Sequence, residues 1–160
     1  MENKILKYQE YLDRFPKCPP SDFSNDDLES FRWINEKPTE SDFIPLNLIK
    51  DPPQRILDDS DLMCTGYGLS FFDTLVNAYN RYVSLYKKRR EHLRNDFITD
   101  YGSSIARINL NKCDGLKGNY NTESGHFTFH MYDDSSLISQ IGEILNIFDD
   151  NGEINNITEE

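Results

Sequence analysis

The sequence has few cations and no long apolar run. Its 160 residues include 17 Lys or Arg against 28 Asp or Glu, which gives a net charge of −11. Phosphate binding depends on Lys and Arg, so this balance argues against nucleic acid as the main ligand and against an anionic membrane surface. No stretch approaches the roughly 18 consecutive apolar residues that a membrane-spanning helix needs, and we expect no contact with a membrane.

Cysteine is scarce as well. The three cysteines, Cys18, Cys64 and Cys113, are widely spaced and form no C-x-x-C pair. An odd, dispersed set is typical of reduced thiols rather than of a disulfide framework. The charged N-terminal residues contain no apolar core of signal-peptide length. We therefore expect a soluble cytoplasmic protein with reduced cysteines.

Motifs for common catalytic and metal sites are missing too. The sequence contains no G-x-x-x-x-G-K-[ST], no G-x-G-x-x-G and no G-x-S-x-G. Cys113, His126 and His130 have the spacing of half a zinc finger, but its first cysteine is absent. The two histidines also lie on an expected strand, where residues four apart are about 13 Å apart. We expect no metal site and no cofactor.

Proline is absent from the second half of the chain. All seven prolines fall between Pro16 and Pro53, and proline breaks helices and strands into short pieces. We therefore expect one domain with a helical or irregular front over residues 1–63, an α+β core over 64–148 and an acidic frayed tail over 149–160.

Apolar spacing predicts helices and a small sheet. Residues three or four apart predict an N-terminal helix over 5–15, a short helix over 25–34 and a long helix capped by Asp73 or Thr74. The same spacing predicts a C-terminal helix that begins at Asp133, Asp134 or Ser135 and includes Phe148. Alternating residues predict strands over 66–72, 104–110 and 126–132. From Asn35 to Met63 we expect mostly irregular chain. The fold class is α+β, with a small, largely antiparallel sheet packed against two or three helices.

Charge is unevenly distributed along the chain. Lys87 to Arg94 (KKRREHLR) carries five cations against one Glu. It lies where the long helix is expected to end, and cations are favoured at that end by the helix dipole. A solvated helix end is the favoured interpretation. The alternative is a local anion site or an intramolecular partner for the acidic segments. By contrast, residues 133–160 hold eight acidic residues and no Lys or Arg.

This acidic segment favours a role in protein binding. A field of one sign steers oppositely charged partners and speeds their association. We expect a non-enzymatic interaction protein, of the immunity, antitoxin or phage-defence accessory type, that binds a more basic protein. The expected contact residues are Trp33, Tyr132, Asp133, Asp134, Asp149 and Asp150.

An enzymatic alternative rests on a resemblance. The strand GYGLSFF, a helix containing Ala78 and Tyr79, and the strand SIARINL resemble the middle of small ADP-ribosyltransferase-like domains. In that family a strand bearing Tyr or Ser and the helix after it help to shape the NAD pocket. The resemblance implies a pocket around Arg32 as the cation, Tyr67 or Ser70 as the middle residue, Glu123 as the acid, and His126. The Glu-x-Glu or Gln-x-Glu pair of a late strand is missing.

A second resemblance carries no activity. The order FRW, CTGYGLSFF, SIARINL and GHFTFH, over residues 31–132, resembles a group of uncharacterised small bacterial proteins. It implies a stand-alone bacterial domain.

Overall fold

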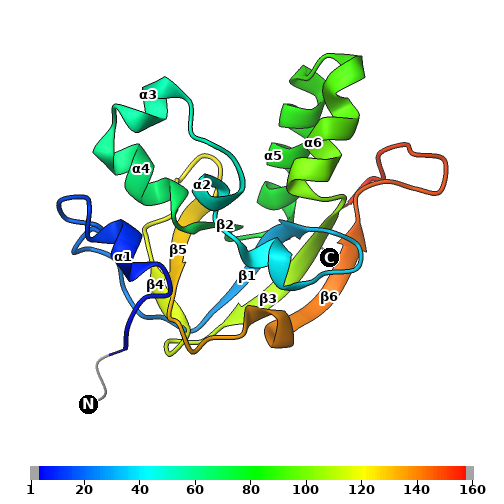
Figure 1. The fold of residues 1–160 in the computed structure, drawn as a ribbon. Helices are drawn as coiled ribbons and strands as arrows, with labels where there is room; N and C mark the ends of the chain where they lie inside the picture. Colours follow the sequence, from blue (N-terminus) through cyan, green and yellow to red (C-terminus); the bar gives the residue numbers. More distant parts are fainter. Residues whose placement is uncertain (1–3, 158–160) are drawn as a thin grey trace.

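One antiparallel sheet organises the molecule. The computed structural model describes residues 4–157, and in this part of the chain six strands pair in the order β4-β5-β2-β1-β3-β6 (Figure 1). The α+β prediction is confirmed. The strands are β1 (Leu28–Ile34), β2 (Leu69–Phe72), β3 (Ser104–Leu110), β4 (Gly115–Lys117), β5 (His126–Met131) and β6 (Ile141–Asn146).

Short helices surround one long helix. The α-helices are α1 (Gln9–Leu12), α2 (Leu46–Ile49), α3 (Gln54–Leu57), α4 (Ser60–Gly66), α5 (Leu75–Lys88) and α6 (Arg94–Tyr101). Three 3-10 helices are η1 (Glu40–Phe43), η2 (Glu91–Leu93) and η3 (Leu137–Gln140). No described helix is long and apolar enough to cross a membrane.

Both faces of the sheet are buried. On one face, which we call the α5 face, Phe31 and Ile105 pack with Tyr82 of α5 and Phe97 of α6. On the opposite face, strand residues such as Phe71 pack with side chains of η1 and η3. Alternation along each strand divides its side chains between the two clusters. In Figure 1, α5 and α6 rise together from one end of the sheet.

Residues 28–34 form β1, not the short helix that their spacing predicts. β1 lies in the middle of the sheet and is buried on both faces. Phe31 contributes to the α5 face and Ile34 to the opposite face. A strand covered on both sides loses the alternation of apolar and polar residues that would distinguish it from a helix.

The predicted C-terminal helix is also wrong. Residues 137–140 form η3 and residues 141–146 form β6, which pairs with β3. Ile144 lies opposite Ala106 and Ile141 opposite Ile108, so three steps on β6 match two on β3. This irregularity lets Ile141 and Ile144 pack against the same cluster although they are three residues apart. A bulge therefore imitates helical spacing.

The predictions for the central part of the chain agree better with the structure. Strand 104–110 is confirmed as β3, strand 126–132 as β5 and the long helix as α5, with the Thr74 hydroxyl accepting the Asn77 amide at its start. Strand 66–72 is shortened because α4 continues to Gly66.

The front of the chain is more regular than expected. The N-terminal helix is a single turn, and residues 35–63 contain η1, α2, α3 and most of α4 instead of irregular chain. At the other end, the Tyr79 hydroxyl donates to the Asn155 carbonyl (2.8 Å) and Ile154 packs against the α5-face cluster. The described part of the predicted frayed tail thus folds back on α5, and residues 158–160 lie outside the described residues.

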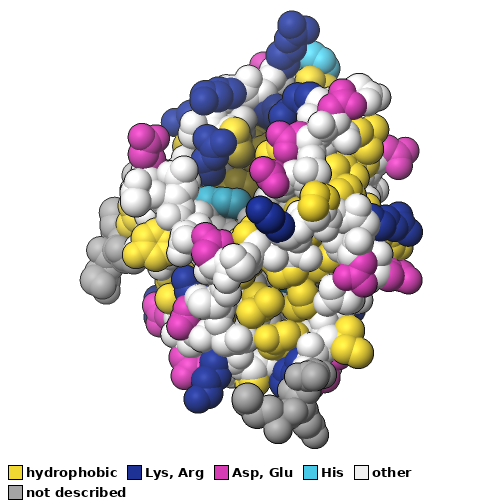
Figure 2. Space-filling model, turned by 90° about the vertical axis from the view of Figure 1, so that its left-hand side faces the viewer, with side chains coloured by type: hydrophobic (Ala, Val, Ile, Leu, Met, Phe, Trp, Pro, Cys, Tyr) yellow, Lys and Arg dark blue, Asp and Glu magenta, His cyan; other side chains and the backbone are white. Residues whose placement is uncertain are grey.

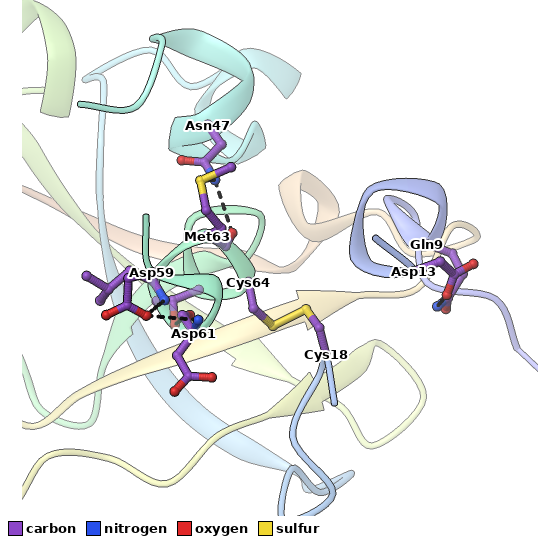
Figure 3. The surroundings of a disulfide bond; sticks show 10 residues. Gln9, Asp13, Cys18, Asn47, Asp59, Asp61, Met63 and Cys64 are labelled. Atoms are coloured by element: carbon purple, nitrogen blue, oxygen red, sulfur yellow. Dashed lines mark hydrogen bonds between the residues drawn. A yellow bond between two sulfur atoms is a disulfide. The ribbon is translucent and has the colours of Figure 1, made fainter. Parts of the chain in front are cut away.

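Two of the three cysteines are paired. Cys18 and Cys64 form a disulfide that ties the segment after α1 to α4 (Figure 3), which corrects the prediction of reduced thiols. Tyr11 of α1 stacks on Tyr67, with ring centroids 5.0 Å apart, and so brings the two segments together. A separation of 46 residues gives no local signal for this pairing. Cys113 is exposed and free.

Candidate functional site

A cleft of about 720 Å³ opens between α5 and the sheet. This volume lies within the range of about 300–1,000 Å³ typical of small-molecule sites. Figure 2 shows a hollow in which a histidine side chain is visible, with Lys and Arg side chains gathered above it. The lining residues are Trp33, Ser70, Phe72, Asn77, Asn80, Arg81, Ser84, Leu85, Asn121, Glu123, Ser124 and His126.

One face of α5 forms a wall of the cleft. Asn77, Asn80, Arg81, Ser84 and Leu85 follow the spacing that places residues on one side of a helix. The other side of α5 packs on the sheet with Leu75, Ala78 and Tyr82. Because the apolar stripe is buried, two side-chain amides, one hydroxyl and one cation of α5 face the cleft.

A serine–histidine pair lies on the floor of the cleft. Alternation along β2 places Ser70 on the same face as Phe72, and the Ser70 Oγ lies 3.0 Å from the His126 Nε2 of β5. The His126 ring packs edge-on against Phe72, with centroids 5.5 Å apart. The pair is thus held by adjacent strands rather than by loops.

Burial and the positive charge of Arg81 lower the pKa of His126. At neutral pH the imidazole is therefore uncharged, and a neutral imidazole nitrogen can accept a proton. Hydrogen bonding to a hydroxyl is the arrangement by which a histidine acts as a base toward a nucleophile. The pair has the chemistry for proton transfer at the cleft floor.

The opposite wall is a constrained loop. The Asn121 Oδ1 accepts the amides of Glu123 (2.8 Å) and Ser124 (3.0 Å). Gly125, with φ +71°, donates its amide to the Asn121 carbonyl (2.7 Å) and accepts the Asp73 amide (3.0 Å). These bonds fix the loop to the start of α5 and hold Glu123 at the cleft.

Arg32 lies behind the floor rather than in the cleft. Its Nη1 donates to the Ser70 carbonyl (2.7 Å), and its Nε and Nη2 donate to the Asp42 carbonyl (3.1 and 2.7 Å). Its guanidinium lies over the rings of Phe43 and Phe71 on the opposite face. Burial lowers the pKa of Arg32 to about 10, so it stays charged at neutral pH. It braces β2 against η1.

The structure brings together three of the five residues implied by the enzymatic resemblance. Ser70, Glu123 and His126 line the cleft. Arg32 faces the other side of the sheet, and Tyr67 is buried in a separate cluster with Leu12 and Met63.

The predicted partner-binding residues do not form one surface. Trp33 is half-buried, and its Nε1 donates to the Ala78 carbonyl (2.9 Å). The Tyr132 hydroxyl accepts from Asn25 (2.7 Å), so neither aromatic is a free anchor. Asp133 and Asp134 are exposed beside Tyr132, after β5, whereas Asp149 and Asp150 are exposed after β6. The chain that follows β5 and the loop that follows β6 lie well apart in Figure 1.

The basic run is only partly a helix end. α5 stops at Lys88, Arg89 and Arg90 link it to η2, and Arg94 begins α6. The Arg89 guanidinium lies over Phe97 and that of Arg94 over Tyr86, at 5.6 and 5.1 Å from the ring centroids. These two cations therefore pack on the aromatic residues between α5 and α6.

No metal centre is found in residues 4–157, where no three His, Cys, Asp or Glu side chains are grouped to hold an ion. Comparison with family models, with curated proteins and with solved structures found no match.

Sequence reasoning missed most of the cleft wall. Asn77, Asn80, Arg81 and Ser84 were not candidates, although they form the polar side of a helix whose apolar stripe was predicted. The signal that identifies them is their spacing, because these polar side chains recur on the side of α5 opposite the tyrosines.

Proposed function

We propose that the cleft binds NAD and that the chain is a small ADP-ribosyltransferase-like enzyme. The observation that carries this proposal is the Ser70–His126 pair, 3.0 Å apart on the floor of the 720 Å³ cleft and flanked by Glu123 and α5. The resemblance implies that a serine-bearing strand and the helix after it shape an NAD pocket, and β2 and α5 are that strand and helix. The position of Arg32 and Tyr67 outside the cleft limits the likeness to part of the expected constellation.

The cleft residues have suitable chemistry for the transfer. The bond between the nicotinamide nitrogen and C1′ of the ribose breaks, and nicotinamide leaves with the bonding electron pair. An acceptor or water then bonds to C1′ and releases a proton, which neutral His126 accepts. Positive charge that develops on the ribose is stabilised by the Glu123 carboxylate. Arg81 makes no ion pair with any described residue and provides the cation for the pyrophosphate.

Titration with NAD tests this function. We expect NAD to raise the melting temperature and to release nicotinamide, detected by chromatography. Ser70→Ala and His126→Gln should lower nicotinamide release by about 10²-fold or more, whereas Ser139→Ala and His92→Gln, which change the same residue types outside the cleft, should leave it unchanged. The absence of both thermal stabilisation and nicotinamide release at millimolar NAD would contradict the proposal.

A second function is supported by the charge of the molecule. With a net charge of −11, an acidic interaction protein of the immunity, antitoxin or defence-accessory type would attract a basic partner. Binding to a basic protein that weakens steeply with salt is the expected result, and salt-insensitive binding would contradict the electrostatic basis of this proposal.

A cytoplasmic location is part of the same proposal. The Cys18–Cys64 disulfide removes the thiol argument for it, because stable disulfides are rare in reducing compartments. Thiol trapping in intact cells tests the location. Alkylation of Cys113 alone would contradict a cytoplasmic location, whereas alkylation of all three cysteines would support it and show that Cys18 and Cys64 pair only after the cells are opened.

A further inference from the structure

Exposed apolar side chains are concentrated on three consecutive short helices. Eight large hydrophobic residues are exposed in the described part of the chain, and five of them lie between positions 46 and 62, with 37–53% of their surface exposed. They belong to α2, α3 and α4. These five residues are Leu46, Leu48, Ile49, Leu57 and Leu62. Scattered single hydrophobics are normal on a surface, but such a concentration marks interaction sites.

The same helices carry an excess of carboxylates. Asp51, Asp58, Asp59 and Asp61 are exposed, and none forms an ion pair with a described cation. We call these four aspartates and the five apolar residues the leucine–aspartate surface. Of the two cations in this span, Lys50 is paired with Asp100 of α6, which leaves Arg55 alone. The surface therefore combines apolar groups with a negative field.

The leucine–aspartate surface is held in place from within. The Asn47 Nδ2 donates to the Met63 carbonyl (3.1 Å) and joins α2 to α4. Asp59 accepts the amides of Asp61 and Leu62 and caps α4, and the disulfide at Cys64 ties α4 to the N-terminal segment (Figure 3). A preorganised surface loses little entropy on binding.

We propose that the leucine–aspartate surface binds a basic amphipathic helix of a partner protein. Leucine side chains on this surface meet the apolar stripe of such a helix, and the aspartates meet lysine or arginine on either side of the stripe. Charge decides the occupant: a second copy of this acidic chain, or an acidic helix, would place like charges together. The proposal rests on the second function given above and names its surface.

A model peptide tests the surface directly. The probe is an amphipathic helical peptide of leucine and lysine, with a leucine–glutamate peptide as its counterpart. In NMR titrations of the full chain, the lysine peptide should shift amides over residues 46–62, and its affinity should fall about tenfold or more between 50 and 300 mM NaCl. The glutamate peptide should not bind.

Variants on and off this surface distinguish binding at the leucine–aspartate surface from attraction by the net negative charge of the chain. Leu57→Ser/Leu62→Ser and Asp58→Asn/Asp61→Asn should each weaken binding about fivefold or more. Leu93→Ser and Asp22→Asn/Asp96→Asn change exposed residues of the same types outside this surface and should have less than about a twofold effect. Circular dichroism and melting curves verify that all variants fold.

Three results would overturn the inference. Equal weakening by the control variants would show that only net charge matters. Amide shifts confined to another region would place binding elsewhere and leave the proposed acidic interaction function standing. Dimerisation of the wild type that Leu57→Ser/Leu62→Ser abolishes would make a second copy the occupant.

Discussion

At the scale of single residues, His130 lies in surroundings that disfavour its charged form. It is buried on β5, its ring lies against Phe23 with centroids 5.6 Å apart, and its Nε2 has no hydrogen-bond partner in the described structure. Burial lowers the pKa of His130 to about 4. The unfolded chain binds this proton as the pH falls below about 6.5, and the folded protein binds it only near pH 4. His130 therefore makes the protein less stable as the pH falls.

The free energy of unfolding should reflect this proton. From the two pKa values, His130 alone should lower it by about 2 kcal/mol between pH 7 and pH 5. Urea titrations of the wild type and His130→Asn at both pH values measure the effect. The variant should lose about 2 kcal/mol less than the wild type over this range. An equal loss in both proteins would contradict the buried, uncharged state of His130.

Gly125 is required by both its conformation and its surroundings. It has φ +71°, and a Cβ added there would lie 1.9 Å from the Asp73 Oδ1. Gly152 has a similar φ of +77° with nothing within 4 Å, so Gly152→Ala reports the backbone cost alone, about 1 kcal/mol. Gly125→Ala should cost at least about 1 kcal/mol more, because Asp73 must move, and should weaken binding in the cleft. Thermal unfolding of both variants measures the difference, and equal costs would contradict it.

At the scale of elements, the disulfide joins two segments that lie far apart in the sequence. Cys18 and Cys64 are 46 residues apart, and closing a loop of this length stabilises a protein by up to about 4 kcal/mol in the chain-entropy model. Without reductant, one thiol per chain, that of Cys113, should react with Ellman's reagent. Cys18→Ser/Cys64→Ser should lower the free energy of unfolding by about 2–4 kcal/mol. Three reactive thiols in the untreated protein would contradict the pairing.

The elements predicted correctly are those whose pattern is local. α5 has a cap at Thr74 and an apolar stripe, and β3 has a clear alternation over 104–110. β1 and β6 were predicted as helices because burial on both faces and a bulge, respectively, change the spacing of their apolar residues. Both causes arise from which strands are neighbours in the sheet, and single-sequence periodicity contains no information on this.

The candidate site, like the fold, was predictable only in part. Ser70, Glu123 and His126 followed from the resemblance, but their association depends on the pairing of β2 with β5 and on the turn at Gly125. Trp33 was expected as an exposed anchor, yet it packs between Phe72 and Tyr82. Composition identifies an aromatic residue, and only the packing shows whether it is available to a partner.

At the scale of the whole molecule, charge repulsion should be measurable. The chain has a net charge of −11, and only four ion pairs occur among residues 4–157. Salt screens repulsion between exposed charges. Raising NaCl from 20 to 500 mM should therefore increase the free energy of unfolding by about 1 kcal/mol, measured by urea titration. A decrease would show that ion pairs outweigh repulsion.

The sheet is nearly divided in two. β1 and β3 pair along all seven residues of β1, whereas β1 and β2 pair only at Phe31 and Phe72. The Arg32 side chain reaches the Ser70 carbonyl beside this single pair. The cleft lies over the same junction, with Trp33 from one half and Ser70 and His126 from the other.

This junction should be where the folded protein opens first. Local opening is easiest where few backbone bonds must break, so amide protons at the Phe31–Phe72 pair should exchange with deuterium faster than those between β1 and β3. Arg32→Leu should speed that exchange further while leaving the β1–β3 amides protected. Uniform protection across the sheet would contradict this division. Motion of the two halves relative to each other would then set the width of the cleft, and a ligand that contacts both halves would slow the exchange.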